Sequence, residues 1–350
     1  MVRSANWLLS PFDEPDDDLF DSQRYIQANL DGGPRCAAII DSNIFYRIVR
    51  LARGHRVKNE VEAKENYRLI AAHMAFFQLC NILIEPNMPL YEGCHSKKDD
   101  ELKLFRKADN LPVKAYIDIA LGRADTIAAD LLESPGESLD PEEEAFTNRL
   151  NEWEFNLIFA AKIAQLELTS NSHEAKMEMF LDWMFQEFQF CSVATIFAVL
   201  YLSPKRKLPL LEKLRSGQMD MRWSGLKNAV WDLTIIDNWL QHANDQHKDG
   251  KYWLLASRDR PLLRVANLLR GYEDITDDQI EERIRALFVE HWGSKSGLQL
   301  AQKYFQLTQR LNESARNQNR PTTPEKWKPL LESLLGELLQ GWDWKSGSPE

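Results

Sequence analysis

The sequence predicts an α/β fold in which a parallel sheet is flanked by helices. Two apolar segments, 36–41 and 251–257, have the composition of buried strands, and an aspartate stands where each apolar run stops, at Asp41 and at Asp259. Helical periodicity follows both segments. Because strand–helix–strand connections favour parallel pairing, we expect the two strands to be neighbours in one sheet, with their acidic ends at the same edge.

The first of these strands opens a region of alternating strands and helices. Residues 1–34 precede it as an acidic N-terminal extension that a Gly-Gly-Pro turn closes. Apolar residues spaced by three or four predict one helix directly after the strand and another across 63–79, and the apolar run 82–84 predicts a second strand. Residues 35–97 therefore form the first half of an α/β core.

The middle of the chain interrupts this core. Residues 98–222 show helical periodicity and no strand alternation, which predicts a large helical insertion. The strand and helix pattern resumes across 223–272, the second half of the core. Residues 273–350 are again helical in pattern and form a C-terminal helical region.

Composition narrows the class of protein. The chain has 350 residues, a net charge of -10, and 44% hydrophobic and 27% charged residues, which is ordinary for a globular protein. The acidic balance argues against a protein that coats nucleic acid, but not against an enzyme that meets phosphate through metal ions. Among its 11 tryptophans, Trp153, Trp183 and Trp223 stand at helical spacing and are more typical of a core than of base stacking.

Cysteine and hydropathy patterns indicate the compartment. The four cysteines lie far apart without a C-x-x-C pair, so neither a structural zinc site nor a disulfide framework is expected. No segment approaches 18 uninterrupted apolar residues. We therefore expect a cytoplasmic protein without a membrane partner.

Four acidic residues are the candidate catalytic and metal-binding groups. Asp41 and Asp259 follow the two strands, Glu92 lies in a proline-bounded stretch after the second strand region, and Asp232 opens a helix before the last strand. Carboxylates that repel one another become stable when Mg²⁺ or Mn²⁺ lies between them, and such ions activate water for hydrolysis of phosphodiesters. The pattern predicts a hydrolase without a protein nucleophile.

Alternatives exist for each of these acids. Glu85 lies closer to a strand end than Glu92, and Asp237 lies on the same helix as Asp232 but on a different face. The two strand-end aspartates could instead cap the helices that follow them, since Asp is a favoured N-cap residue.

The order and setting of these residues resemble the PIN-domain nucleases. That family has a D-x-N motif after the first strand, a middle glutamate, an aspartate at the start of a later helix, and a hydroxyl residue two positions before a final aspartate. The corresponding residues here are Asp41 with Asn43, Glu92, Asp232, and Ser257 with Asp259. The resemblance implies a PIN-like sheet core and an endonuclease, most often acting on RNA, whose acids bind Mg²⁺ or Mn²⁺. It further implies that Asn43 and Ser257 position the first acid and the water that the metal holds.

Basic residues around the last acid are candidates for substrate binding. Arg258, Arg260 and Arg264 flank it and are expected to guide the phosphate backbone of RNA. The helical regions are the candidate surfaces for a protein partner or a second copy of the chain. Two other functions compete with the nuclease: a PIN-like RNA-binding protein without catalysis, and an all-helical interaction or scaffold protein.

Overall fold

The computed structural model of the protein describes most of the chain. The described residues are 6–11, 18–54, 61–93, 98–133, 151–205, 211, 213–245, 250–271, 276–313 and 323–340.

The chain divides into two compact units. Unit 1 comprises Met1–Arg149 and Asp237–Asn267, and unit 2 comprises Leu150–Ile236 and Leu268–Glu350. The sequence boundaries differ from this division, because the insertion expected across 98–222 contributes its first part to unit 1. The C-terminal helical region and the remainder of the insertion share unit 2.

Unit 1 contains all the described strands. They are β1 (Leu8–Leu9), β2 (Arg35–Ile40), β3 (Leu83–Glu85) and β4 (Lys251–Ala256). Its helices are α1 (Ser22–Leu30), α2 (Ser42–Ala52), α3 (Val61–Leu79), α4 (Asn87–Glu92), α5 (Lys98–Asp109), α6 (Val113–Ala120) and α7 (Ala129–Glu133). The end of α11 (Met219–Asn244) and the start of α13 (Arg260–Leu269) also belong to it.

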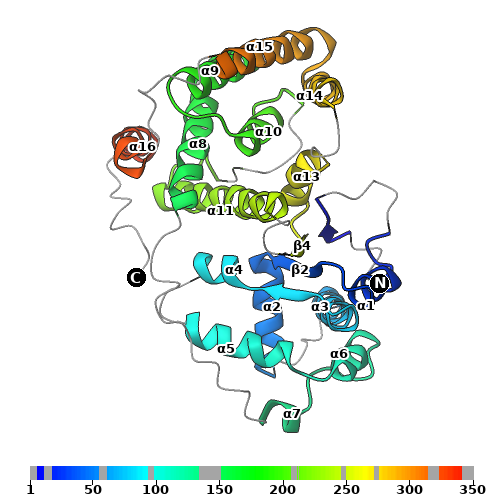
Figure 1. The fold of residues 1–350 in the computed structure, drawn as a ribbon. Coiled ribbons are helices and arrows are strands. Elements are labelled where there is room, and N and C mark those ends of the chain that lie inside the picture. Colours follow the sequence, from blue (N-terminus) through cyan, green and yellow to red (C-terminus); the bar gives the residue numbers. More distant parts are fainter. Residues whose placement is uncertain are drawn as a thin grey trace. The chain divides into compact units, whose positions relative to one another are not determined.

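The strands form one four-stranded sheet in the order β1-β4-β2-β3. Figure 1 labels its two central strands, β2 and β4. β2 runs parallel to β4, with Ile40 opposite Ala256, and parallel to β3 on its other side. The prediction that segments 36–41 and 251–257 are parallel neighbours is therefore confirmed. The α/β class is confirmed too, so the fold of the described chain is not all-helical.

The edge strand β1 makes the sheet mixed instead of purely parallel. β1 pairs antiparallel with β4, and Leu8 lies opposite Ala256. The preceding Trp7 is fully buried, and Tyr25 of α1 is also buried. Parts of the expected N-terminal extension thus belong to the core of unit 1. A strand of two residues is too short to produce the alternation by which strands are recognised in a sequence.

Helix α2 follows from its apolar pattern. Ile44, Ile48 and Leu51, the three residues that predict its inner face, are all fully buried. They join a hydrophobic core that also contains residues of β2, β4 and α3. Because β2 ends at Ile40 and α2 starts at Ser42, a single residue connects the two elements.

The described residues of unit 2 form helices and their connections, without a strand. Its helices are α8 (Asn151–Leu168), α9 (His173–Gln186), α10 (Ser192–Tyr201), α14 (Asp277–Trp292), α15 (Ser294–Glu313) and α16 (Pro324–Leu339), together with α11 as far as Ile236. Trp153, Trp183 and Trp223 are all buried, which confirms that they are core residues.

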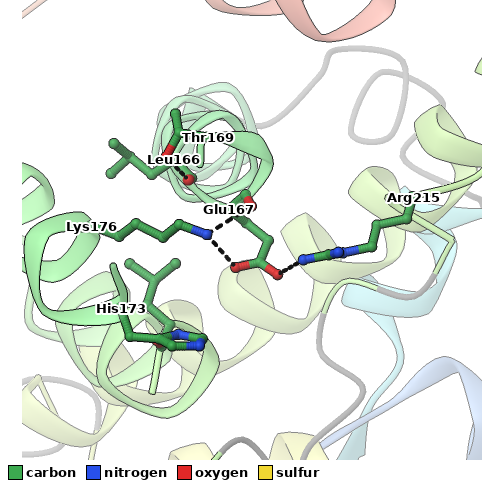
Figure 2. Close-up of polar contacts among 7 residues, drawn as sticks. Leu166, Glu167, Thr169, His173, Lys176 and Arg215 are labelled. Carbon is green, nitrogen blue, oxygen red and sulfur yellow. Dashed lines mark hydrogen bonds and ion pairs between the residues drawn. The ribbon is translucent and has the colours of Figure 1, made fainter. Parts of the chain in front are cut away.

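A buried ion pair connects α8 to α9 in unit 2. Figure 2 shows the carboxylate of Glu167 between Lys176 and Arg215. The Lys176 Nζ atom lies 3.5 Å from Glu167 Oε2, and Arg215 Nη2 donates to Glu167 Oε1 at 2.7 Å. Lys176 also donates to the Glu167 backbone carbonyl at 3.0 Å. Because Glu167 and Lys176 are both buried, this pair fixes the turn between the two helices.

Within the described part of the chain, no helix combines the length and the apolar character that are needed to cross a membrane.

Candidate functional site

Asp41 stands at the end of β2 and at the N-cap position of α2. Its backbone is extended, with φ -80° and ψ 156°, as is usual for an N-cap residue. The side chain, however, forms no capping hydrogen bond to the helix. Its Oδ2 atom accepts hydrogen bonds from Ser257 Oγ at 2.6 Å and from the side-chain amide of Asn43. The carboxylate is therefore held towards the end of β4.

Ser257 and Asn43 connect the two strand ends. The backbone N–H of Asp259 donates to Ser257 Oγ at 2.9 Å, and the backbone N–H of Arg258 donates to Asn43 Oδ1 at 3.1 Å. Parallel pairing of β2 with β4 brings these residues to the same sheet edge. The two motifs that lie far apart in the sequence thus form one hydrogen-bonded group.

Asp259 caps the helix that follows it, which was the alternative to a role in metal binding. Its Oδ1 atom accepts a hydrogen bond from the backbone N–H of Leu262 at 3.1 Å, in the first turn of α13. Capping occupies this oxygen without removing the charge of the carboxylate. The negative charge of Asp259 disfavours ionisation of Asp41 and so helps to raise the pKa of Asp41.

The electrostatics relate three of the four predicted acids. Burial is the main cause that raises the pKa of Asp41, and the charge of Asp259 adds to it, while the hydrogen bond from Ser257 acts in the opposite direction. Desolvation raises the pKa of Glu92 to about 7, and the charge of Asp41 adds to that shift. The side chain of Glu92 as a whole is exposed to solvent. Its carboxyl group is nevertheless desolvated by the protein atoms around it. We call Asp41, Glu92 and Asp259 the acid cluster.

The structure distinguishes Glu92 from its alternative. Glu85 is the last residue of β3, and its Oε1 atom accepts a hydrogen bond from the backbone N–H of Asn87 at 3.3 Å. Burial raises its pKa, and the charges that modify this shift come from Arg106 and Lys251. Asp41 and Ser42 both act on the pKa of Glu92, whereas burial, Asn87, Arg106 and Lys251 act on that of Glu85, so we keep Glu92 as the third acid.

The fourth acid lies on α11, which contributes to both units. Asp232 is half-buried and belongs to unit 2, whereas its alternative Asp237 is half-buried and belongs to unit 1. The role of Asp232 stays a prediction.

The basic residues near the cluster differ in their surroundings. Arg258 is half-buried, and its Nη2 atom donates to Asn66 Oδ1 on α3 at 2.5 Å. On α13, Arg260 is exposed and Arg264 half-buried. Arg47 of α2 was not anticipated, although it follows Asn43 by four residues and so lies on the same helix face. Its Nη1 atom donates to the backbone carbonyl of Asn43.

The acid cluster offers carboxylate oxygens, the ligand type that hard divalent cations prefer. Among the residues that the structure describes, no three or more His, Cys, Asp or Glu are grouped so that they could hold a metal ion. The fit therefore rests on chemistry: Asp259 raises the pKa of Asp41, and Asp41 raises that of Glu92. Carboxylates that oppose each other's ionisation are stabilised by a cation such as Mg²⁺ or Mn²⁺, which prefers oxygen ligands.

Comparisons with known proteins add no relative. No protein-family model, no curated protein and no solved structure matches the chain.

Proposed function

We propose that this protein is a metal-dependent endonuclease that hydrolyses phosphodiester bonds, with RNA as its expected substrate. The main support is the hydrogen bond of 2.6 Å between Ser257 Oγ and Asp41 Oδ2 at the ends of two parallel strands. It joins the two halves of the motif pattern that resembles the PIN-domain nucleases. Ligands of open α/β sheets bind at this edge, beyond the carboxyl ends of the strands.

The acid cluster would hold the ion through Asp41, Glu92 and Asp259. When bound, Mg²⁺ or Mn²⁺ supplies the Lewis acidity that activates water and the scissile phosphate. Asp232 of α11 is the proposed fourth ligand, and Asp237 is its alternative. Mutation of each residue tests which of them contributes.

Asn43 and Ser257 act as positioning residues. Both donate to the same oxygen of Asp41, so they fix the orientation of its carboxylate. Hydrogen bonds to the charged form also favour ionisation, which partly offsets the effect of burial on the Asp41 pKa. Partners that orient a metal ligand typically affect metal affinity or activity by about 10- to 100-fold.

Substitution of Asp259 by Asn tests the proposed chemistry. The amide oxygen can still accept the hydrogen bond from Leu262, so α13 keeps its cap while the cluster loses one negative charge. We expect cleavage to fall by about a hundredfold or more, since even residues that only orient a ligand have effects approaching that size. The assay incubates the protein with single-stranded RNA, structured RNA and DNA in Mg²⁺, Mn²⁺ or EDTA.

The outcomes separate the competing functions. Cleavage that persists in EDTA, or that the Asp259→Asn variant retains, excludes this mechanism. Binding of RNA without cleavage under any condition favours the binding-only alternative. Asp232→Asn and Asp237→Asn, compared in the same assay, identify which residue of α11 contributes, because only that variant should lose activity.

A further inference from the structure

Two arginines from different elements contact Asn43, the residue whose side-chain amide donates to the carboxylate of Asp41. Arg47 belongs to α2, and Arg258 follows β4. The Arg47 guanidinium donates to the backbone carbonyl of Asn43, and the backbone N–H of Arg258 donates to Asn43 Oδ1 at 3.1 Å, so both residues contact Asn43. Burial is the main cause that lowers the pKa of Arg258, and the charge of Arg47 adds to it. Asp41 raises the pKa of Arg47, but burial and the charge of Arg50 have larger effects in the opposite direction.

The protein satisfies these guanidinium groups only in part. Arg47 donates one side-chain hydrogen bond, to the Asn43 carbonyl, and Arg258 donates one, to the Asn66 side chain. Both acceptors are neutral oxygens. Among the described residues, neither arginine forms an ion pair. The Nη1 atom of Arg258 is buried and has no hydrogen-bond partner.

This arrangement is unfavourable for a merely structural pair of arginines. A guanidinium carries five N–H donors, and leaving a buried charged donor without a partner costs more than leaving a neutral one. Two adjacent cations also repel each other. Both costs are offset when an anion with several acceptor oxygens binds, and phosphate matches the planar fork of arginine.

We propose that Arg47 and Arg258 form a phosphate subsite beside the acid cluster, oriented by Asn43 and Asn66, and that it binds a backbone phosphodiester of the nucleic-acid strand. This inference rests on the proposed function, because the cluster supplies the cleavage that such a subsite would serve. The subsite extends the expected substrate-binding surface from the connection between β4 and α13 to Arg47 of α2 and Asn66 of α3. The strand is thereby expected to pass over the N-terminal part of α2.

Binding without cleavage tests the subsite. A short fluorescent oligoribonucleotide is titrated with the full chain in EDTA at several KCl concentrations, and anisotropy gives Kd. Arg47→Ala and Arg258→Ala should each weaken binding about tenfold or more, as expected for hydrogen bonds to a charged group. Each should also reduce the slope of log Kd against log salt by about 0.7, the contribution of one phosphate contact on a single strand.

Matched variants control for charge and for folding. Arg53→Ala removes an exposed arginine at the C-terminal end of the same helix and should bind as the parent protein does. Arg47→Lys and Arg258→Lys keep the positive charge but lose the two parallel N–H donors of the guanidinium. Compared with the alanine variants, they should recover the salt slope more fully than the affinity. These two variants keep the test available if an alanine variant fails to fold.

The results decide between the subsite and its rivals. Parent-like binding by both alanine variants, or an equal loss in Arg53→Ala, overturns the proposal. If inorganic phosphate binds but the oligonucleotide does not, the assignment to a strand is wrong. Cleavage in Mn²⁺ is measured in parallel: its absence on this oligonucleotide and on every substrate of the cleavage assay goes against the nuclease function, whereas intact cleavage with unchanged binding refutes only the subsite.

Discussion

At the scale of single residues, the surroundings of a carboxylate decide what it can do. Asp41 and Asp259 both precede a helix, and their sequence settings are alike. Asp259 caps α13, whereas the Asp41 side chain leaves α2 uncapped and turns to Ser257 and Asn43. Burial then keeps the pKa of Asp41 above its ordinary value. The Asp41 carboxylate is therefore bonded to the end of β4 and not to the first turn of α2 through a capping hydrogen bond.

His73 gives a prediction about pH. It is fully buried on α3, its ring stacks on Trp7 at 3.5 Å, and neither ring nitrogen has a hydrogen-bond partner. Burial, with a contribution from Arg258, lowers its pKa well below 6.5. The unfolded chain therefore takes up a proton that the folded protein refuses, and stability from this residue is lost as pH falls below about 6.5.

His73→Phe should remove that dependence while keeping an aromatic ring against Trp7. The stability difference between variant and parent should grow on acidification, by up to about 1.4 kcal/mol per pH unit. Urea unfolding of both proteins at neutral and mildly acidic pH measures it, and groups that titrate in both cancel. A difference that stays constant with pH would show that His73 can be protonated in the folded state.

At the scale of elements, the sequence predicts what local pattern determines. β2, β4 and the inner face of α2 follow from apolar runs and spacing, and so does the shared edge of the two strands. β1 was missed because two residues carry no alternation. The hydrogen bond of Arg258 to Asn66 joins residues far apart in the chain, so no local pattern reports it. The proximity of Glu92 to Asp41 likewise depends on how α4 packs. Residue spacing does not show this packing, so it could not decide between Glu92 and Glu85.

The buried ion pair between α8 and α9 gives a prediction at the same scale. The Glu167 side chain is 3% exposed and that of Lys176 7%, whereas that of Arg215 is 73% exposed. Glu167→Ala leaves the Lys176 ammonium buried without its carboxylate and should cost about 3–5 kcal/mol of unfolding free energy. Arg215→Ala loses an exposed partner and should cost about 1 kcal/mol or less.

Chemical denaturation of these variants measures the difference. The double variant Glu167→Met with Lys176→Met is the control, because it removes both charges and should be more stable than Glu167→Ala. Equal losses in Glu167→Ala and Arg215→Ala would mean that the buried lysine finds another partner.

At the scale of the whole molecule, each unit has its own core, and α11 contributes residues to both. Proteins with more than one such unit often unfold in more than one step. The acid cluster lies in unit 1 and the Glu167–Lys176 pair in unit 2, so the two units can be perturbed separately.

Calorimetry should therefore resolve two responses. On the proposed function, Mn²⁺ binds the acid cluster in the folded state alone, so it should stabilise unit 1 by about 2.7 kcal/mol at a hundred times its Kd and raise the Tm of one transition. Asp41→Asn should abolish this response, while Glu167→Ala should lower the Tm of the other transition and leave the response to Mn²⁺ intact.

A response to Mn²⁺ that survives in Asp41→Asn would exclude Asp41 as a ligand. If Mn²⁺ and Glu167→Ala shift the same single transition, the two units unfold together, and the continuous helix α11 is the element that would couple them.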